Sequence, residues 1–140
     1  MAAYDKSSNL NLKLYTICMI KDLKTTITIK GMSGTNYIFN VYGFTRFSDL
    51  ANAFKSIPAL YAFTRRFPNN PISYTHDLIY VGETGDLSTR FDNHHKQDCI
   101  VRGNANCICI HSFQGTTLER LAAEADILNA FDLPCNIKNN

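Results

Sequence analysis

The chain has 140 residues, of which 45% are hydrophobic and 19% are charged, and its formal net charge is +2. This length favours one domain, and the composition excludes disordered and fibrous proteins. The charge is uneven, because residues 1–57 carry a net +4 and residues 58–140 a net −2. This balance excludes a strongly basic nucleic-acid-binding domain, although the first half can supply a mildly basic face.

Hydrophobic segments and cysteines both indicate a protein of the cytoplasm. The longest apolar run near the start, residues 15–20, is far shorter than the roughly 18–20 residues of a membrane-spanning helix. No basic segment precedes it, which argues against a signal peptide. The cysteines form no Cys-x-x-Cys pair and match no zinc-site spacing. We therefore expect no membrane partner, and reduced, mostly buried thiols at Cys18, Cys99, Cys107, Cys109 and Cys135.

Residues 1–57 are expected to form a β-hairpin extension that packs on the same domain as the rest of the chain. Partial alternation predicts a strand over residues 10–20. Two β-branched or aromatic runs, residues 25–30 and 37–42, flank a turn-rich connection and indicate a hairpin. A short helix over residues 48–55, capped by Ser48, is expected to follow.

In the second half, residues 59–64 and 78–81 are strand-like, and the Pro- and Asn-rich segment between them is expected to be a loop. Asp86 is a suitable N-cap for a helix over about residues 87–95. Residues 107–113 are expected to form another strand.

The last helix has the clearest sequence signature. Thr116 and Glu119 fit a capping box, in which each side chain bonds the other residue's backbone N–H. Pro134 is expected to stop the helix. Its core face is expected to consist of the apolar residues at helical spacing: Leu118, Leu121, Ala122, Ala125 and Leu128.

One stretch of the chain resembles a known nuclease signature. Residues 80–90 read Tyr-Val-Gly-Glu-Thr-Gly-Asp-Leu-Ser-Thr-Arg, with Ala59-Leu60-Tyr61 about twenty residues upstream and Glu124 and Asn136 downstream. This order of features resembles the GIY-YIG nuclease superfamily over roughly residues 58–138. The resemblance implies an α/β fold, a small mixed or antiparallel sheet flanked by helices, extended here by the N-terminal hairpin.

The resemblance also implies a divalent-metal-dependent endonuclease that hydrolyses phosphodiester bonds, with DNA expected over RNA. Glu124 would hold Mg²⁺ or Mn²⁺, Tyr61 would act as general base, and Tyr80 would orient water or phosphate. Arg90 would clamp the phosphate, because its planar donors match phosphate geometry. His94 would lie near the phosphate, and Asn136 would fix the geometry of the site.

Each of these residues also has a purely structural interpretation. Glu124 and His94 fit a solvated helix surface, and Arg90 fits an ion pair with Asp86 four residues earlier. The two tyrosines fit a hydrophobic core, and Asn136 fits a turn after the helix. Arg65 and Arg66 end the first strand, where they fit either solvated charges or contacts to a nucleic-acid backbone away from the cut.

Two positions depart from the family pattern and leave an alternative function open. Ala59 replaces the first glycine, and Glu83 adds a negative charge directly after Gly82. The charge at Glu83 would weaken phosphate binding or support the metal. The alternative is a catalytically inactive module that keeps the fold and binds nucleic acid or protein, and the modest net charge of the chain favours it.

Overall fold

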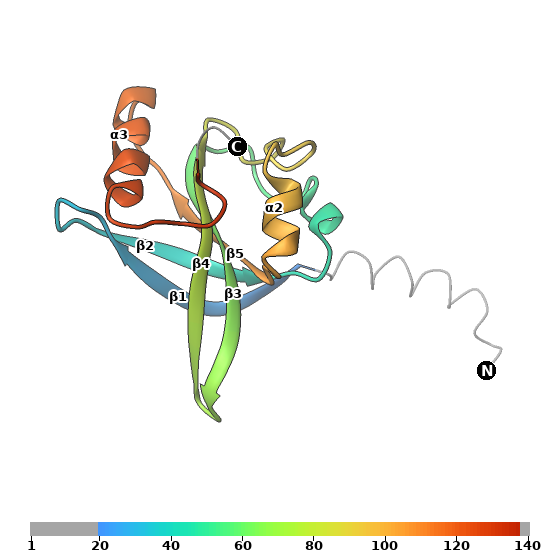
Figure 1. Cartoon of the computed structure of the whole chain (residues 1–140). Coiled ribbons are helices and arrows are strands. Elements are labelled where there is room, and N and C mark those ends of the chain that lie inside the picture. The colour runs from blue at the N-terminus through green and yellow to red at the C-terminus, as the bar shows by residue number, and fades with distance from the viewer. Residues whose placement is uncertain (1–19, 138–140) are drawn as a thin grey trace, which may run out of the picture.

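The computed structural model describes residues 20–137 of the chain (Figure 1). The expected strand over residues 10–20 therefore lies, except for Ile20, outside the described residues. The described part is an α/β fold built on one five-stranded antiparallel sheet, with strand order β1-β2-β5-β3-β4. Its elements are β1 (Lys21–Lys30), β2 (Asn36–Gly43), the 3-10 helix η2 (Phe47–Leu50), β3 (Ala59–Asn70), β4 (Ser73–Thr84), α2 (Gln97–Arg102), β5 (Cys107–Ser112) and α3 (Thr117–Leu128).

The sheet has a hydrophobic cluster on each face, and a different helix covers each one. Alternation along β3 sends Tyr61 and Phe63 into the cluster that includes Ile100 of α2. Leu60 and Ala62 of β3 point the other way, to the cluster covered by α3. Figure 1 shows the two helices on opposite sides of the β3–β4 pair. None of the described helices is long and apolar enough to cross a membrane.

The β3–β4 hairpin extends well beyond the rest of the sheet. β3 pairs with β5 only as far as Thr64, whereas it pairs with β4 as far as Asn70. Residues 65–77 thus form a two-stranded projection, which we call the arm (Figure 1). The expected loop between the strands was wrong. Pro68 is tolerated in a strand because no third strand needs its missing N–H, and Asn70 closes the tight turn by accepting from the backbone N–H groups of Ile72 and Ser73.

The β1–β2 hairpin joins the same sheet and is also tied to α3. β2 pairs with β5 over residues 40–43. The Asp126 carboxylate accepts from the backbone N–H and the hydroxyl of Ser33 and from the Tyr37 hydroxyl. The backbone N–H of Met32 donates to the Asp126 carbonyl. These bonds hold the hairpin turn against the helix.

Two expected helices in the middle of the chain were wrong. Instead of a helix over residues 48–55, the chain forms the single 3-10 turn η2, which begins after Arg46 and buries Phe47 and Leu50. Residues 87–95 form turns, and the helix α2 starts only at Gln97. The Asp86 carboxylate accepts from the N–H and the hydroxyl of Ser88, two residues on, and so stabilises a local turn.

Helix α3 begins with the expected capping box but buries a different face. Thr116 accepts from the Glu119 N–H, and the Glu119 carboxylate accepts from the Thr116 N–H, which confirms the predicted start. The expected core face was wrong, because Leu118 is 78% exposed and Leu121 is 41% exposed. The buried residues are Arg120, Ala123 and Ile127. Arg120 can face the sheet because Glu83 of β4 neutralises its charge.

The expectation of reduced cysteines was wrong for one pair. Cys99 of α2 and Cys135, after α3, form a disulfide across a sequence separation of 36 residues. Cys107 and Cys109 are buried free thiols, as expected. The sequence could not show the pairing, because the two cysteines approach each other only once the segment after α3 returns along β4. Disulfides are typical of oxidising compartments, so this pair does not support the expected cytoplasmic location.

Candidate active site

The two candidate tyrosines project from neighbouring strands on the α2 face of the sheet. Tyr61 lies opposite Gly82 in the β3–β4 register, and Phe63 lies opposite Tyr80. Tyr61 and Tyr80 are therefore diagonal cross-strand neighbours, with ring centroids 6.0 Å apart. A Cβ at Gly82 would lie 2.6 Å from both the Cζ and the Oη of Tyr61. Glycine at this position provides the space that the Tyr61 ring occupies.

The Tyr61 hydroxyl oxygen is the centre of a small hydrogen-bond cluster. It accepts from the Nε of Arg90 at 2.9 Å and lies 2.7 Å from the Nε2 of His94. The Nδ1 of His94 accepts from the backbone N–H of Lys96, so the proton of the neutral ring is on Nε2. His94 therefore donates to Tyr61, and the phenol oxygen receives two donors.

Burial controls the protonation of this cluster. The side chain of Tyr61 is 0% exposed, and burial raises its pKa, with a further increase from Tyr80 that Arg90 only partly offsets. Burial, with Arg90 and His95 nearby, lowers the pKa of His94 to about 3, so His94 is neutral at physiological pH. Arg90 alone therefore does not make Tyr61 the ionised base that its expected role requires.

The turns of residues 87–95 bring Arg90 and His94 to the sheet without a helix. Leu87 is fixed by a hydrogen bond from its N–H to the Ile57 carbonyl. Phe91 is buried against Tyr61, with ring centroids 5.1 Å apart, and anchors the segment between Arg90 and His94. The alternative interpretations as a surface histidine and an Asp86–Arg90 pair are not what the structure shows. His94 is 4% exposed, and the Arg90 Nε bonds Tyr61.

Glu124, the candidate metal ligand, lies at the edge of the same site. It is half-buried on α3. Burial is the main cause of the raised pKa of Tyr80, and the charge of Glu124 raises that pKa further. Glu83 does not face this site as a free carboxylate, because it accepts from the Nε of Arg120 at 2.8 Å in a largely buried ion pair. Residues 20–137 contain no group of three or more His, Cys, Asp or Glu side chains that could hold a metal. One carboxylate beside a phenol nevertheless suits Mg²⁺, which keeps several waters and commonly uses one or two protein carboxylates.

Asn136 acts on the backbone of β4 rather than across the site. Its side-chain oxygen accepts from the Val81 N–H and its side-chain nitrogen donates to the Val81 carbonyl, both at 2.9 Å. The neighbouring Cys135 N–H donates to the Ile79 carbonyl. Because β4 is an edge strand, these bonds complete its open side next to Tyr80. Asn136 thus positions the strand that carries Tyr80.

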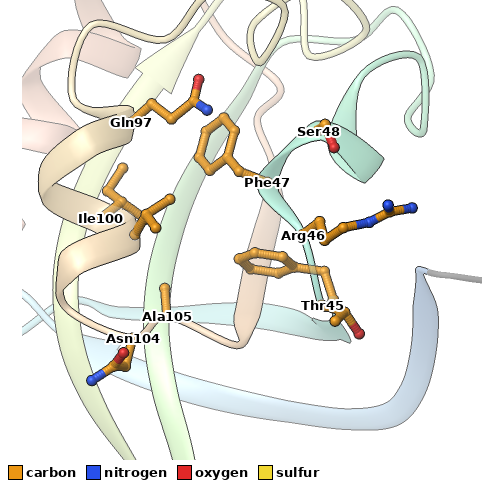
Figure 2. A pocket seen from close by; sticks show the side chains of 10 residues that line it. Thr45, Arg46, Phe47, Ser48, Gln97, Ile100, Asn104 and Ala105 are labelled. Atoms are coloured by element: carbon orange, nitrogen blue, oxygen red, sulfur yellow. The ribbon is translucent and has the colours of Figure 1, made fainter.

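A groove adjoins the site between η2 and α2. It has a volume of about 530 Å³, and Figure 2 shows Phe47 of η2 opposite Ile100 and Gln97 of α2. Phe47 also packs on His94, with ring centroids 6.2 Å apart. Sequence reasoning missed this wall of the site, because η2 was expected to be part of a longer helix, and it missed Phe91 and Arg120, whose spacing carries no signal of burial.

Comparison of the chain with family models, with curated proteins and with solved structures found no match to any of them. What supports a functional class is therefore the site itself. The structure brings together Tyr61, Tyr80, Arg90 and His94, with Glu124 at the edge of the cluster and Asn136 behind Tyr80.

Proposed function

We propose that the chain is a metal-dependent endonuclease of the GIY-YIG type, which hydrolyses a phosphodiester bond, with DNA as the expected substrate. The observation that carries this proposal is the state of Arg90. Its guanidinium is half-buried and bound to Tyr61 beside Tyr80, and no carboxylate of residues 20–137 lies within ion-pair distance of it. Its Nε donates to the Tyr61 hydroxyl and its side chain also bonds the Tyr80 hydroxyl, so two phenols hold a planar guanidinium whose donors suit a phosphate.

The other residues have consistent roles around a phosphate on Arg90. Tyr61 holds the guanidinium in place through its oxygen, and the neutral His94 holds Tyr61 by donating to the same atom. Tyr80 presents a second hydroxyl at the same site. Glu124 would hold Mg²⁺ or Mn²⁺, which when bound would neutralise charge that develops on the phosphate oxygens. Asn136 keeps Tyr80 in register by bonding Val81.

The complete burial of Tyr61 favours a second candidate, an inactive module that binds nucleic acid. A neutral, wholly buried phenol with a raised pKa is a poor general base. In this alternative Arg90 binds a phosphate that is never cut. The two functions share the anion site and differ only in turnover.

Nicking of supercoiled plasmid with Mg²⁺ or Mn²⁺, against the same reaction in EDTA, separates the two functions. For the nuclease, Arg90→Lys should slow single-turnover cleavage about 10- to 1,000-fold, because lysine keeps the charge and loses the paired donors. The matched control is Arg102→Lys, an exposed arginine in the last turn of α2, which should leave the rate unchanged. Binding of DNA without metal-dependent nicking would refute the nuclease and support the inactive module.

A further inference from the structure

Arg66, in the arm, has a feature that the folded chain alone does not explain. Its guanidinium lies over the Tyr74 ring, 3.5 Å from the ring centroid. Its Nε is buried and has no hydrogen-bond partner, the only buried side-chain N or O atom of this kind in the part of the chain that the structure describes. No carboxylate of that part pairs with it either. A buried donor without a partner is rare in native proteins and calls for an explanation.

Arg66 lines a pocket of about 320 Å³ whose polar side chains are either basic or uncharged. The other polar side chains there are Lys21 at the start of β1, Thr45 and Asn106, and none of the residues that line the pocket carries a carboxylate. Two cations, a hydroxyl and an amide are donors that suit an anion with several oxygens. We call this pocket the basic pocket.

The chain holds Arg66 rigidly at this position. The Asn106 side chain accepts from the Arg66 N–H at 2.7 Å and donates to the Arg66 carbonyl at 2.9 Å. This pair continues the sheet by one residue beyond β5, as Asn136 does at the edge of β4. With its backbone fixed and its guanidinium stacked on Tyr74, Arg66 loses little side-chain entropy when it binds a ligand.

We propose that the basic pocket binds a backbone phosphate of the nucleic-acid substrate, away from the bond that is cut. This inference rests on the proposed function. Arg66 lies five residues beyond Tyr61 on β3, which is roughly 17 Å at the rise of a β-strand, or about five phosphates along one nucleic-acid strand. An odd separation also places Arg66 on the opposite face of β3 from Tyr61. The phosphate therefore belongs to a backbone that has passed around the two-stranded arm, or to the second strand of a duplex.

The test compares Arg66→Gln with Arg65→Gln, because the two neighbours lose the same charge. Arg65 points to the other face and is already paired with Asp77 at 2.9 Å. Fluorescence anisotropy with a 20-nucleotide DNA, single-stranded or duplex, is run in EDTA so that no probe is cut. Arg66→Gln should raise Kd about tenfold and reduce the slope of log K against log salt by about 0.9 for the duplex and about 0.7 for the single strand. Arg65→Gln should change Kd about twofold or less.

A second pair of measurements keeps the inference testable if Arg66→Gln fails to fold. Lys21→Gln, which removes the other cation that lines the pocket, should weaken DNA binding in the same direction as Arg66→Gln. Inorganic phosphate at millimolar concentration should shift the amide NMR signals of Asn106 and Arg66 in the wild type. Phosphate shifts combined with unchanged DNA affinity in both variants would overturn the inference, because the pocket would then bind free phosphate only.

The outcomes separate this inference from the proposed function. If the wild type neither binds nor nicks DNA, the proposed function fails and the inference fails with it. If the wild type nicks DNA while Arg66→Gln and Arg65→Gln weaken binding equally, or not at all, only the basic pocket is refuted.

Discussion

Gly82→Ala is the substitution that tests the geometry of the candidate site most directly. The new Cβ would lie 2.6 Å from the Cζ and Oη of Tyr61 and 2.8 Å from the Cε2 of Tyr80. These contacts are far shorter than van der Waals contact, and neither ring is free to move. Tyr61 is wholly buried and held by Arg90 and His94, and Tyr80 is 5% exposed.

Overpacking of a well-packed core costs about 1–3 kcal/mol, and replacing glycine offsets roughly 0.4–1 kcal/mol of this through the unfolded chain. We expect Gly82→Ala to lower the free energy of unfolding by about 1–2 kcal/mol, measured by urea unfolding. Gly43→Ala is the matched control, because its Cβ would meet Leu23 at 3.6 Å, an ordinary contact at the end of a strand. Equal stability of the two variants would refute the placement of Tyr61 against Gly82.

Three further predictions concern the supports of the site. Asn136→Asp should lower the free energy of unfolding by about 1–3 kcal/mol, because a carboxylate cannot donate to the Val81 carbonyl. Asn93→Asp, at an exposed position, is the control in urea unfolding. Equal losses in the two variants would contradict the role of Asn136. Reductant should lower the free energy of unfolding by about 3–4 kcal/mol, since the disulfide closes a loop of 36 residues, and it should leave Cys99→Ser unchanged; an insensitive wild type would refute the pair. The contribution of neutral His94 to the free energy of unfolding should be complete above about pH 6.5 and fall as the pH drops toward 3, because the unfolded chain protonates His94 first. The loss is about 2 kcal/mol at pH 5. An equally steep loss in His94→Gln would contradict this prediction.

The β-strands were largely predictable, because strand formation here follows local patterns. β-branched and aromatic runs located β1 and β2 within a few residues of their bounds, and the strand expected over residues 107–113 matches β5. The arm escaped prediction because Pro68 and the asparagines around it have the composition of a loop. Only the pairing of β3 with β4 shows that residues 65–70 have no third strand beside them, and in that context a proline has no pairing to break.

The helices were less predictable, because competing side-chain contacts decide them. Asp86 is a good N-cap by composition, but its carboxylate bonds Ser88, and Phe91 and His94 are buried among the aromatic residues beside Tyr61. A regular helix over residues 87–95 would place these anchors differently from the turns that the chain adopts. The buried face of α3 was missed for a related reason. Burial of Arg120 depends on Glu83, a partner 37 residues away, which no local pattern reveals.

The candidate site divides in the same way. The sequence order of the motif residues was enough to predict that Tyr61, Tyr80 and Arg90 lie together, because strand register and short connections determine their relative positions. Their protonation depends on burial, and the sequence contains no measure of burial. The structure gives Tyr61 a raised pKa and two donors on its oxygen, which makes it first of all the support of Arg90. If the chain cuts DNA, loss of the Tyr61 hydroxyl should therefore weaken phosphate binding as well as turnover, whereas a residue that served only as a base would affect turnover alone.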